Sequence, residues 1–203
     1  VAQHRDEALA RGAVLRDELA AGFAPNTACE HTGMTVLLGA CEADNAAAVQ
    51  MLIDAGAEYA CYASDITRTF PVNGRFTPEQ RELYDIVLAA QLSAIEEVRP
   101  GKSFEAYHLA AVRVLTQGLI RLGLLKGSLR SNLESHTYRK FYMHKTGHWL
   151  GLDVHDVGDY RVDGEFRELE PGMVVTVEPG LYISPDLKGV PARYRGIGIR
   201  IED

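Results

Sequence analysis

Four acidic residues stand in or at the end of segments that otherwise have the composition of β-strands. They are Asp54, Asp65, Glu178 and Glu202. Carboxylates are depleted in strands, because a charged side chain packs poorly on a half-buried sheet. Any one strand acid is unremarkable, but four acids that converge on one place would create a strongly negative site with a chemical use.

The first two acids lie in "DAGAEYACYASDITRTF", which has the pattern of two strands joined by a tight connection. If these strands form an antiparallel hairpin that turns near residues 59–60, Asp54 and Asp65 fall opposite each other, or nearly so, on one face. Like charges in such positions destabilise a sheet, and burying them unpaired is costly. A positive charge must lie between them. Either Arg68 or another protein cation neutralises one acid while the other faces solvent, or a metal ion binds both.

Glu178 and Glu202 extend the pattern to the second half of the chain. Glu178 lies in the middle of the apolar run from 173 to 182, where a buried strand would place valine. Glu202 follows three alternating isoleucines at 197–201, so Arg200 and Glu202 face the side opposite those isoleucines. Carboxylates that converge from several strands are typical of a site for a hard cation.

Three histidines lie close together in the glycine-rich stretch "MHKTGHWLGLDVHDVGDY", the last of them His155. His144 and His148 have the i, i+4 spacing of a zinc-protease helix. However, Lys145 stands where that motif requires glutamate, and Gly147 disfavours a helix, so that interpretation fails. The remaining histidines, for which we expect structural roles, are His4, His31, His108 and His136.

An oxygen-rich donor set with one imidazole favours manganese or a similar ion, with cobalt, iron and zinc as alternatives. Two divalent ions carry four positive charges, which would match the four carboxylates. A water molecule that bridges two such ions loses a proton easily, because each ion lowers its pKa. The residues therefore predict a dinuclear site that generates a nucleophile.

The rest of the sequence predicts an α+β domain. Thr77 as a cap and Pro78 in the first helical position begin one helix, and Ser103 begins another. Segment 126–142 has mixed polar character and no assigned element. Strands, then two helices, then strands indicate helices packed on a curved sheet. The expected elements are helices at 4–23, 77–98 and 103–122 and strands at 49–70, at 172–183 with an interruption at Pro179-Gly180, and at 195–203.

Composition excludes several other classes of protein. The chain of 203 residues is long enough for one substantial core. Its net charge of -7 disfavours a nucleic-acid partner, because phosphate binding needs clustered Lys and Arg. No apolar run is long enough to cross a bilayer, so we expect no membrane partner. The three cysteines form no CxxC pair, which favours free thiols in a reducing cytoplasm.

Four linked motifs carry a resemblance to a known family over about residues 50–203. They are "DAGAEY…SDITRTFPVNGRFTPEQRELYDIVL", "HKTGHWLGLDVHDVG", "LEPGMVVTVEPGLYI" and "RGIGIRIED", in this order. Together they resemble the catalytic domain of the Xaa-Pro aminopeptidases (aminopeptidase P), which are pita-bread metallopeptidases alongside prolidase and methionine aminopeptidase. The resemblance implies a curved antiparallel sheet with helices packed on its outer face, and a single catalytic domain over 1–203.

By position, the resemblance implies that five residues bind two divalent metal ions, most readily Mn²⁺. Asp65 and Glu202 would bridge both ions, and Asp54 would chelate one of them. His148 and Glu178 would complete the coordination of the other. Each of these residues already stands out by its strand position or by its place in the histidine-rich stretch.

The resemblance also implies catalytic roles around this centre. Glu178 would move a proton from the attacking water to the departing nitrogen. His155 would contact the substrate carbonyl, and His144 would line the substrate pocket. Arg200 would orient Asp54 from behind the metal ligands. The predicted reaction is hydrolysis of the bond between an N-terminal residue and a following proline, by a hydroxide that bridges the two ions.

Two departures from the family pattern leave alternatives open. The family carries a further histidine in a segment resembling "LHYTEN" before the first aspartate, whereas residues 36–45 contain none. Its members also carry a separate N-terminal domain and continue past the last glutamate, so we expect this chain to be a fragment. The alternatives are a prolidase restricted to dipeptides, a methionine aminopeptidase, or a pita-bread domain that binds peptides without catalysis. A homo-oligomer is left open.

Overall fold

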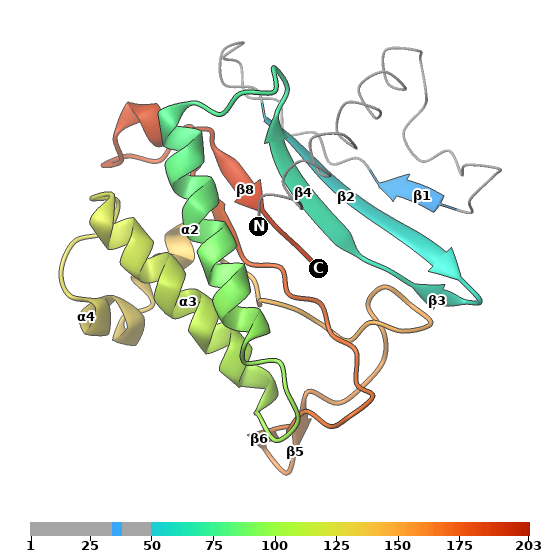
Figure 1. The fold of residues 1–203 in the computed structure, drawn as a ribbon. Coiled ribbons are helices and arrows are strands. Elements are labelled where there is room, and N and C mark those ends of the chain that lie inside the picture. Colours follow the sequence, from blue (N-terminus) through green and yellow to red (C-terminus); the bar gives the residue numbers. More distant parts are fainter. Residues whose placement is uncertain (1–33, 38–49) are drawn as a thin grey trace.

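The computed structural model describes residues 34–37 and 50–203. The helix predicted at 4–23 lies outside the described residues, as do residues 38–45 of the segment without histidine. Two long helices lie beside a set of extended strands (Figure 1). This combination of antiparallel strands and packed helices confirms the predicted α+β class.

The first strands form an antiparallel sheet around a long hairpin. Strand β2 (Gln50–Tyr59) pairs along one edge with β1 (Met34–Leu37) and along the other with β4 (Ile66–Pro71). The short strand β3 (Tyr62–Ala63) pairs with the end of β2. The two predicted strands at 49–70 are therefore confirmed, with the second divided into β3 and β4.

The turn of this hairpin fixes which residues share a face. Its central residues, Ala60 and Cys61, have φ angles of 51° and 69°, as a two-residue hairpin turn requires, so the turn lies one residue later than predicted. The register places Thr67 opposite Asp54. Asp65 precedes Thr67 by two positions and lies on the same face. The expected near-opposition of the two acids is therefore a diagonal approach across the hairpin.

The last strands continue the antiparallel order. Strand β7 (Gly180–Tyr182) pairs with β8 (Gly198–Arg200). Just after β8, Glu202 donates its backbone N–H to the carbonyl of Thr67 in β4, at 3.0 Å. The hydroxyl of Thr69, also in β4, hydrogen-bonds the backbone at the end of β8. These contacts place β8 between β7 and β4.

Residues 146–150 add an outer edge to this arrangement. Backbone hydrogen bonds of 2.7 to 3.2 Å join them to residues 174–178 in antiparallel order. The strand predicted at 172–183 is correct only for β7, because its first part is held by these bonds and by a single bridge, between Trp149 and Val175. Pro179, which has no N–H to donate, separates the two parts.

Two helices cover the strands, and their ends follow the predicted signals. Helix α2 (Pro78–Ile95) begins at Thr77 with a complete capping box, and ends three residues before the predicted boundary. Helix α3 (Phe104–Arg121) begins after Ser103, whose side chain caps it, and ends before Gly123, which has a φ of 72°. In the described part of the chain, no helix combines the length and apolarity needed to span a bilayer.

Short elements account for the segments that the sequence left unassigned. A six-residue helix cannot show the periodicity that identifies longer ones, so α4 was missed despite its capping Ser128. The short elements are α4 (Leu129–Glu134), the 3₁₀ helices η1 (Thr137–Lys140) and η2 (Ala192–Tyr194), and the hairpin strands β5 (Arg161–Val162) and β6 (Glu165–Phe166).

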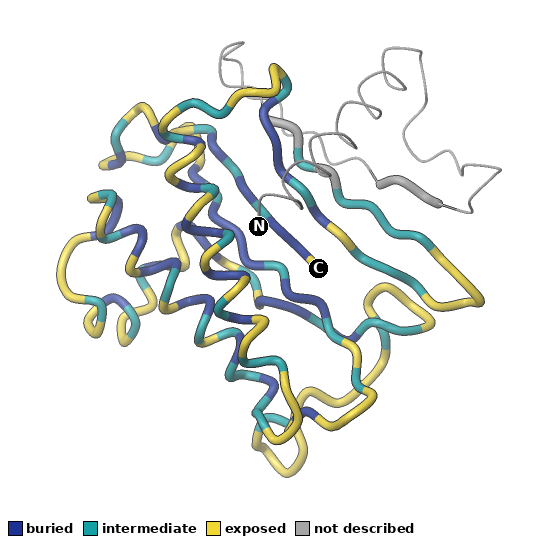
Figure 2. Tube along the Cα trace, viewed as in Figure 1, coloured by how far each residue is buried: buried dark blue, intermediate teal, exposed yellow. Residues whose placement is uncertain are grey.

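The hydrophobic core lies between the helices and the sheet. Figure 2 shows buried positions on the facing sides of α2, α3 and the β8 region. The alternating isoleucines Ile197, Ile199 and Ile201 are all buried in this core, as predicted. Gly118 lets α3 approach α2 closely, because a Cβ atom there would lie 2.5 Å from the side chain of Ile86. One face of the last strand is thus apolar, which leaves the other free for polar groups.

Replacing the helix cap tests this account of α2. We expect Thr77→Ala to lower the free energy of unfolding by about 1 kcal/mol, because the N–H of Gln80 loses its side-chain acceptor. Thr77→Ser keeps the hydroxyl and should stay close to the parent protein. Urea unfolding measures both, and equal stability of the Ala and Ser variants would contradict the capping role.

Candidate metal centre

The five predicted ligands come from five separate parts of the chain and meet on one face of the sheet. Because side chains at alternate positions of neighbouring strands point to the same side, each strand supplies one of them. They are Asp54 in β2, Asp65 just before β4, His148 in the 146–150 edge, Glu178 just before β7 and Glu202 just after β8.

Three overlapping groups of side chains bring their ligand atoms within 4.8 Å of one another. Asp65 and Glu202 each belong to two of the groups, and only these two residues are carboxylates shared between groups. Shared carboxylates are the arrangement by which two neighbouring cations can be held together. The groups are Asp54–Asp65–Glu202, His148–Glu178–Glu202 and Asp65–His148–His155.

The hydrogen bonds of His148 fix which ring nitrogen faces the acids. Its Nδ1 lies 2.9 Å from the carbonyl oxygen of Trp149. A carbonyl only accepts, so Nδ1 carries the hydrogen. Nε2 lies 3.4 Å from a carboxylate oxygen of Asp65 and 3.7 Å from one of Glu178. In the neutral ring, Nε2 therefore presents a lone pair among carboxylates, an arrangement that becomes favourable when a second proton or a metal cation lies between them.

Arg200 is the protein cation closest to the cluster, and it serves mainly one acid. Its guanidinium donates to Asp54 and, at 3.1 Å, to the hydroxyl of Thr67. It lies 3.7 Å from Glu202. Arg200 and Asp54 are thus in direct contact, and the orienting role of Arg200 stays a prediction. Arg68, the alternative that the sequence offered, instead donates to Asp203 at 2.6 Å.

The two glutamates of the cluster have strongly raised pKa values. Burial raises the pKa of Glu178 to about 7, although Arg200 and His148 act in the opposite direction. Burial likewise raises the pKa of Glu202 to about 8, against a hydrogen bond donated by Thr67. The side chain of Glu202 is only 2% exposed. Without added positive charge, these acids therefore retain protons near neutral pH.

The pKa values of the two aspartates change in opposite directions. Burial and a hydrogen bond with Asp65 raise the pKa of Asp54 above its usual range, against the opposing effect of Arg200. The hydrogen bond from His148 lowers the pKa of Asp65. Like charges at short range push paired titrations apart in this way. One guanidinium and one imidazole cannot neutralise four carboxylates.

The donor set fits divalent cations. Four carboxylates and an imidazole are the ligand types that manganese, iron, cobalt and zinc accept. The tautomer of His148 and the raised pKa values of both glutamates are what a protein shows where positive charge is needed. These observations support divalent metal binding by this cluster.

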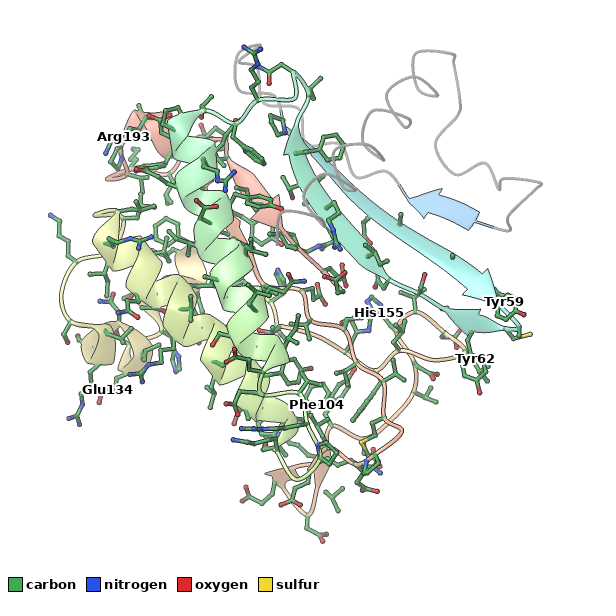
Figure 3. All side chains as sticks on the ribbon, in the orientation of Figure 1. Tyr59, Tyr62, Phe104, Glu134, His155 and Arg193 are labelled. Carbon is green, nitrogen blue, oxygen red and sulfur yellow. The ribbon has the colours of Figure 1, made fainter. Side chains whose placement is uncertain are left out.

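Two further histidines border the cluster. The ring of His155 stands edge-on to that of His148, with centroids 4.2 Å apart; Figure 3 labels it on the strand side of the molecule. His144 lies 4.0 Å from a carboxylate oxygen of Glu178, and its Nε2 is held by the hydroxyl of Tyr182 at 2.9 Å. Both histidines line a pocket of about 750 Å³, which His148, Glu178 and Arg200 also line.

Sequence reasoning missed two polar residues of the site. Thr67 donates to Glu202 and accepts from Arg200, so it links two predicted residues. Tyr182 holds His144. A signal was available for both, because Thr67 lies two positions after Asp65 and Tyr182 four positions after Glu178, on the faces that alternation already assigned to the acids.

The raised pKa values predict how metal binding depends on pH. The folded chain without metal binds more protons than the unfolded chain between the ordinary glutamate pKa and about 8. Its stability should therefore fall as pH rises through that range. A cation must displace those protons, so the increase in melting temperature on adding MnCl₂ to EDTA-treated protein should be larger at about pH 8.5 than at about pH 6.

Glu202→Gln supplies the control for this measurement. It removes one of the raised groups, so the melting temperature in EDTA should depend less on pH than that of the parent protein. An equal or larger effect of MnCl₂ at the lower pH would contradict the proposed protonation of the cluster.

Comparisons with known proteins agree with this geometry. The model of metallopeptidase family M24 matches residues 8–203. Xaa-Pro aminopeptidases of Haemophilus influenzae and Escherichia coli are 59% and 58% identical over 153 residues, which is 75% of this chain. The solved structure of Pseudomonas aeruginosa aminopeptidase PepP is 51% identical, with a TM-score of 0.80 over 94% of this chain.

The matches also show how much of each relative the chain represents. It spans about a third of the two curated relatives, 35% and 34% of their lengths, and 45% of the Pseudomonas chain. A zinc-substituted E. coli aminopeptidase P in complex with product is 57% identical, with a TM-score of 0.72 over 76% of this chain. At these identities the likeness extends to the pita-bread fold. The chain belongs to metallopeptidase family M24.

Proposed function

We propose that this protein is a Xaa-Pro aminopeptidase, a dinuclear metallopeptidase that removes an N-terminal residue from peptides with proline in second position. The observation that carries the proposal is the convergence of Asp54, Asp65, His148, Glu178 and Glu202, of which His148 and Glu178 also line a pocket. The Xaa-Pro aminopeptidases among its relatives support the substrate class. We further propose that residues 1–203 belong to one catalytic domain, working in the cytoplasm.

The proposed cofactor is a pair of Mn²⁺ ions, which these five residues would hold, with Asp65 and Glu202 as the carboxylates shared between groups. The oxygen-rich donor set favours manganese over softer-ligand metals. When bound, such ions would polarise the scissile carbonyl and lower the pKa of the attacking water. The protein's own residues must then position the peptide and move protons.

Glu178 would move the proton. The proposal is supported by its position, because it belongs to the ligand cluster and also lines the pocket where the peptide would bind. The nitrogen of a Xaa-Pro bond carries no hydrogen, so it must receive a proton before proline leaves. His144 lies 4.0 Å from Glu178 on the pocket side.

His155 and His144 would hold the substrate. His155 lies in a group with Asp65 and His148, so its imidazole can donate to the oxygen that becomes negative during attack. His144 is fixed by Tyr182 and by the carbonyl of Lys145, at 2.9 and 2.7 Å. A ring held at both nitrogens keeps its orientation when the peptide enters.

The free amino terminus of the substrate would bind beside Asp54. This is the most exposed carboxylate of the cluster, with 29% of its side chain accessible, and Arg200 holds it in place. An ammonium or amine recognised at this point sets the distance to the attacked carbonyl. That distance would explain why only the first residue is released.

Hydrolysis of defined peptides tests the proposal. We expect the purified protein with MnCl₂ to cleave a Xaa-Pro-Xaa tripeptide after its first residue, and we expect EDTA to abolish the activity because the ions supply the Lewis acid. Full activity in metal-stripped protein would contradict the proposal. A Xaa-Pro dipeptide and a Met-Ala peptide, run beside it, identify a prolidase or a methionine aminopeptidase. No cleavage of any of them would favour a peptide-binding domain.

Substitution of single residues tests the bridging roles. We expect Asp65→Asn and Glu202→Gln to lower activity by more than about 100-fold, and bound metal below two ions per chain, because each carboxylate would serve both ions. His144→Ala should cost about 10-fold and keep the metal content. Metal analysis and peptide assays measure these changes, and equal losses in all three variants would contradict the assignment.

A further inference from the structure

His108, for which the sequence predicted a structural role, lies in the same pocket as the candidate metal centre. It belongs to α3, and it lines the pocket together with His144 and Glu178. Phe104, one turn earlier on the same helix and labelled in Figure 3, also lines this pocket. The helix therefore contributes an imidazole to the cavity that His144, His148 and Glu178 also line.

A chain of three hydrogen-bonding groups determines which nitrogen of His108 carries the hydrogen. Nδ1 of His108 lies 2.9 Å from the hydroxyl oxygen of Thr146, which lies 2.7 Å from the hydroxyl oxygen of Tyr142. Thr146 and Tyr142 are both buried. Among residues 34–37 and 50–203, the hydroxyl of Tyr142 has no other hydrogen-bond partner, so it must donate to Thr146 to satisfy its hydrogen.

That donation fixes the direction of the other hydrogen bond in this series, between Thr146 and His108. Thr146 accepts from Tyr142 and uses its own hydrogen to donate to Nδ1 of His108, which is then an acceptor. In the reverse order a buried hydroxyl hydrogen would have no acceptor, at a substantial free-energy cost. His108 is therefore the tautomer with hydrogen on Nε2. Within the described residues Nε2 has no protein partner, and it lies on the ring edge opposite the one that Thr146 holds.

The surroundings of His108 keep this ring neutral. Burial lowers its pKa to about 4, and the nearby charges of Lys145, His144 and Arg139 act in the same direction. A neutral imidazole with a fixed Nε2–H is a hydrogen-bond donor without charge. Such a donor suits an uncharged acceptor, which a peptide supplies in every main-chain carbonyl.

We infer that His108 is a substrate-binding residue, whose Nε2–H donates to an acceptor oxygen of the peptide, a main-chain carbonyl or the terminal carboxylate. The inference rests on the proposed function. Phe104, Tyr107, Tyr160 and Phe166 give this pocket aromatic walls. A peptide carbonyl that loses water against such walls needs a donor, and His108 supplies one on the side of the pocket that α3 forms.

Two variants of His108 separate substrate binding from a structural role. In His108→Asn, the side-chain oxygen can still accept from Thr146, but the donor at the Nε2 position is gone. In His108→Gln, a donor returns near the Nε2 position, while Thr146 loses its acceptor. A structural role therefore predicts that Asn is the better replacement, and substrate binding predicts that Gln is.

We expect His108→Asn to raise KM for a Xaa-Pro-Xaa tripeptide by about 3- to 10-fold with little change in kcat, because one hydrogen bond is lost equally in ground and transition states. His108→Gln should recover part of this loss, even if its melting temperature is lower. Leu109→Gln is the matched control, since this neighbouring side chain is exposed and should leave KM unchanged. The KM effect is then compared for the tripeptide with a free C-terminal carboxylate and for the same tripeptide with a C-terminal amide. An effect that disappears with the amide indicates that His108 binds the carboxylate, and an effect that remains indicates that it binds a main-chain carbonyl.

The possible results distinguish a failure of this inference from a failure of the proposed function. Absence of Xaa-Pro hydrolysis by the parent protein would overturn the proposed function itself. Hydrolysis by the parent protein with an unchanged KM in His108→Asn would overturn only the role of His108. A second readout needs no activity: NMR of isotope-labelled histidine should find His108 neutral and protonated at Nε2 near neutral pH. A hydrogen on Nδ1 would overturn the inference.

Discussion

Repulsion among four carboxylates is the constraint on which the rest of this structure depends. Asp54, Asp65, Glu178 and Glu202 lie close enough to share ligand positions, in surroundings that exclude much of the water that would otherwise screen them. Arg200 offsets one of them. The remaining negative charge is neutralised either when the carboxylates retain protons or when they bind cations. Only cation binding gives the arrangement a chemical use.

The antiparallel sheet makes this concentration of charge possible. Neighbouring segments run from β2 through β4, β8 and the β7 region to residues 146–150, and each places one donor on the same face. The opposite face carries the isoleucines that pack against the helices. The core therefore holds the strands in register, and the register sets the distances between the donors. The same packing brings α3 to the edge of the pocket, where His108 meets the 146–150 segment.

Much of this could be predicted from the sequence, for identifiable reasons. Alternation marked Glu202 and Arg200 as facing away from the isoleucines, and capping residues marked the starts of α2 and α3. The turn at residues 60–61 was misplaced by one position, because neither central residue is the glycine or asparagine that normally marks such a turn.

Other features depend on contacts between distant segments, which no local pattern encodes. The interruption at Pro179-Gly180 was predicted, but β-branched composition did not reveal that the segment before it is held by hydrogen bonds to residues 146–150 and a single bridge. The role of Thr67 follows from its meeting with residue 202, and that of His108 from its meeting with Thr146. A lone histidine on a helix carries no signal of the hydroxyl that orients it.

The hydrogen bond between Thr67 and Glu202 also has a consequence for the stage of folding at which the site is complete. The two residues are separated by 135 positions, so closing this contact requires an ordered loop that contains nearly the whole described chain. Contacts of such long range form late, after helices and hairpins are in place. During synthesis Asp54 and Asp65 emerge long before Glu202, and at that stage the nascent chain holds only these two of the five candidate ligands. The complete ligand set is therefore available only once this long-range contact has closed.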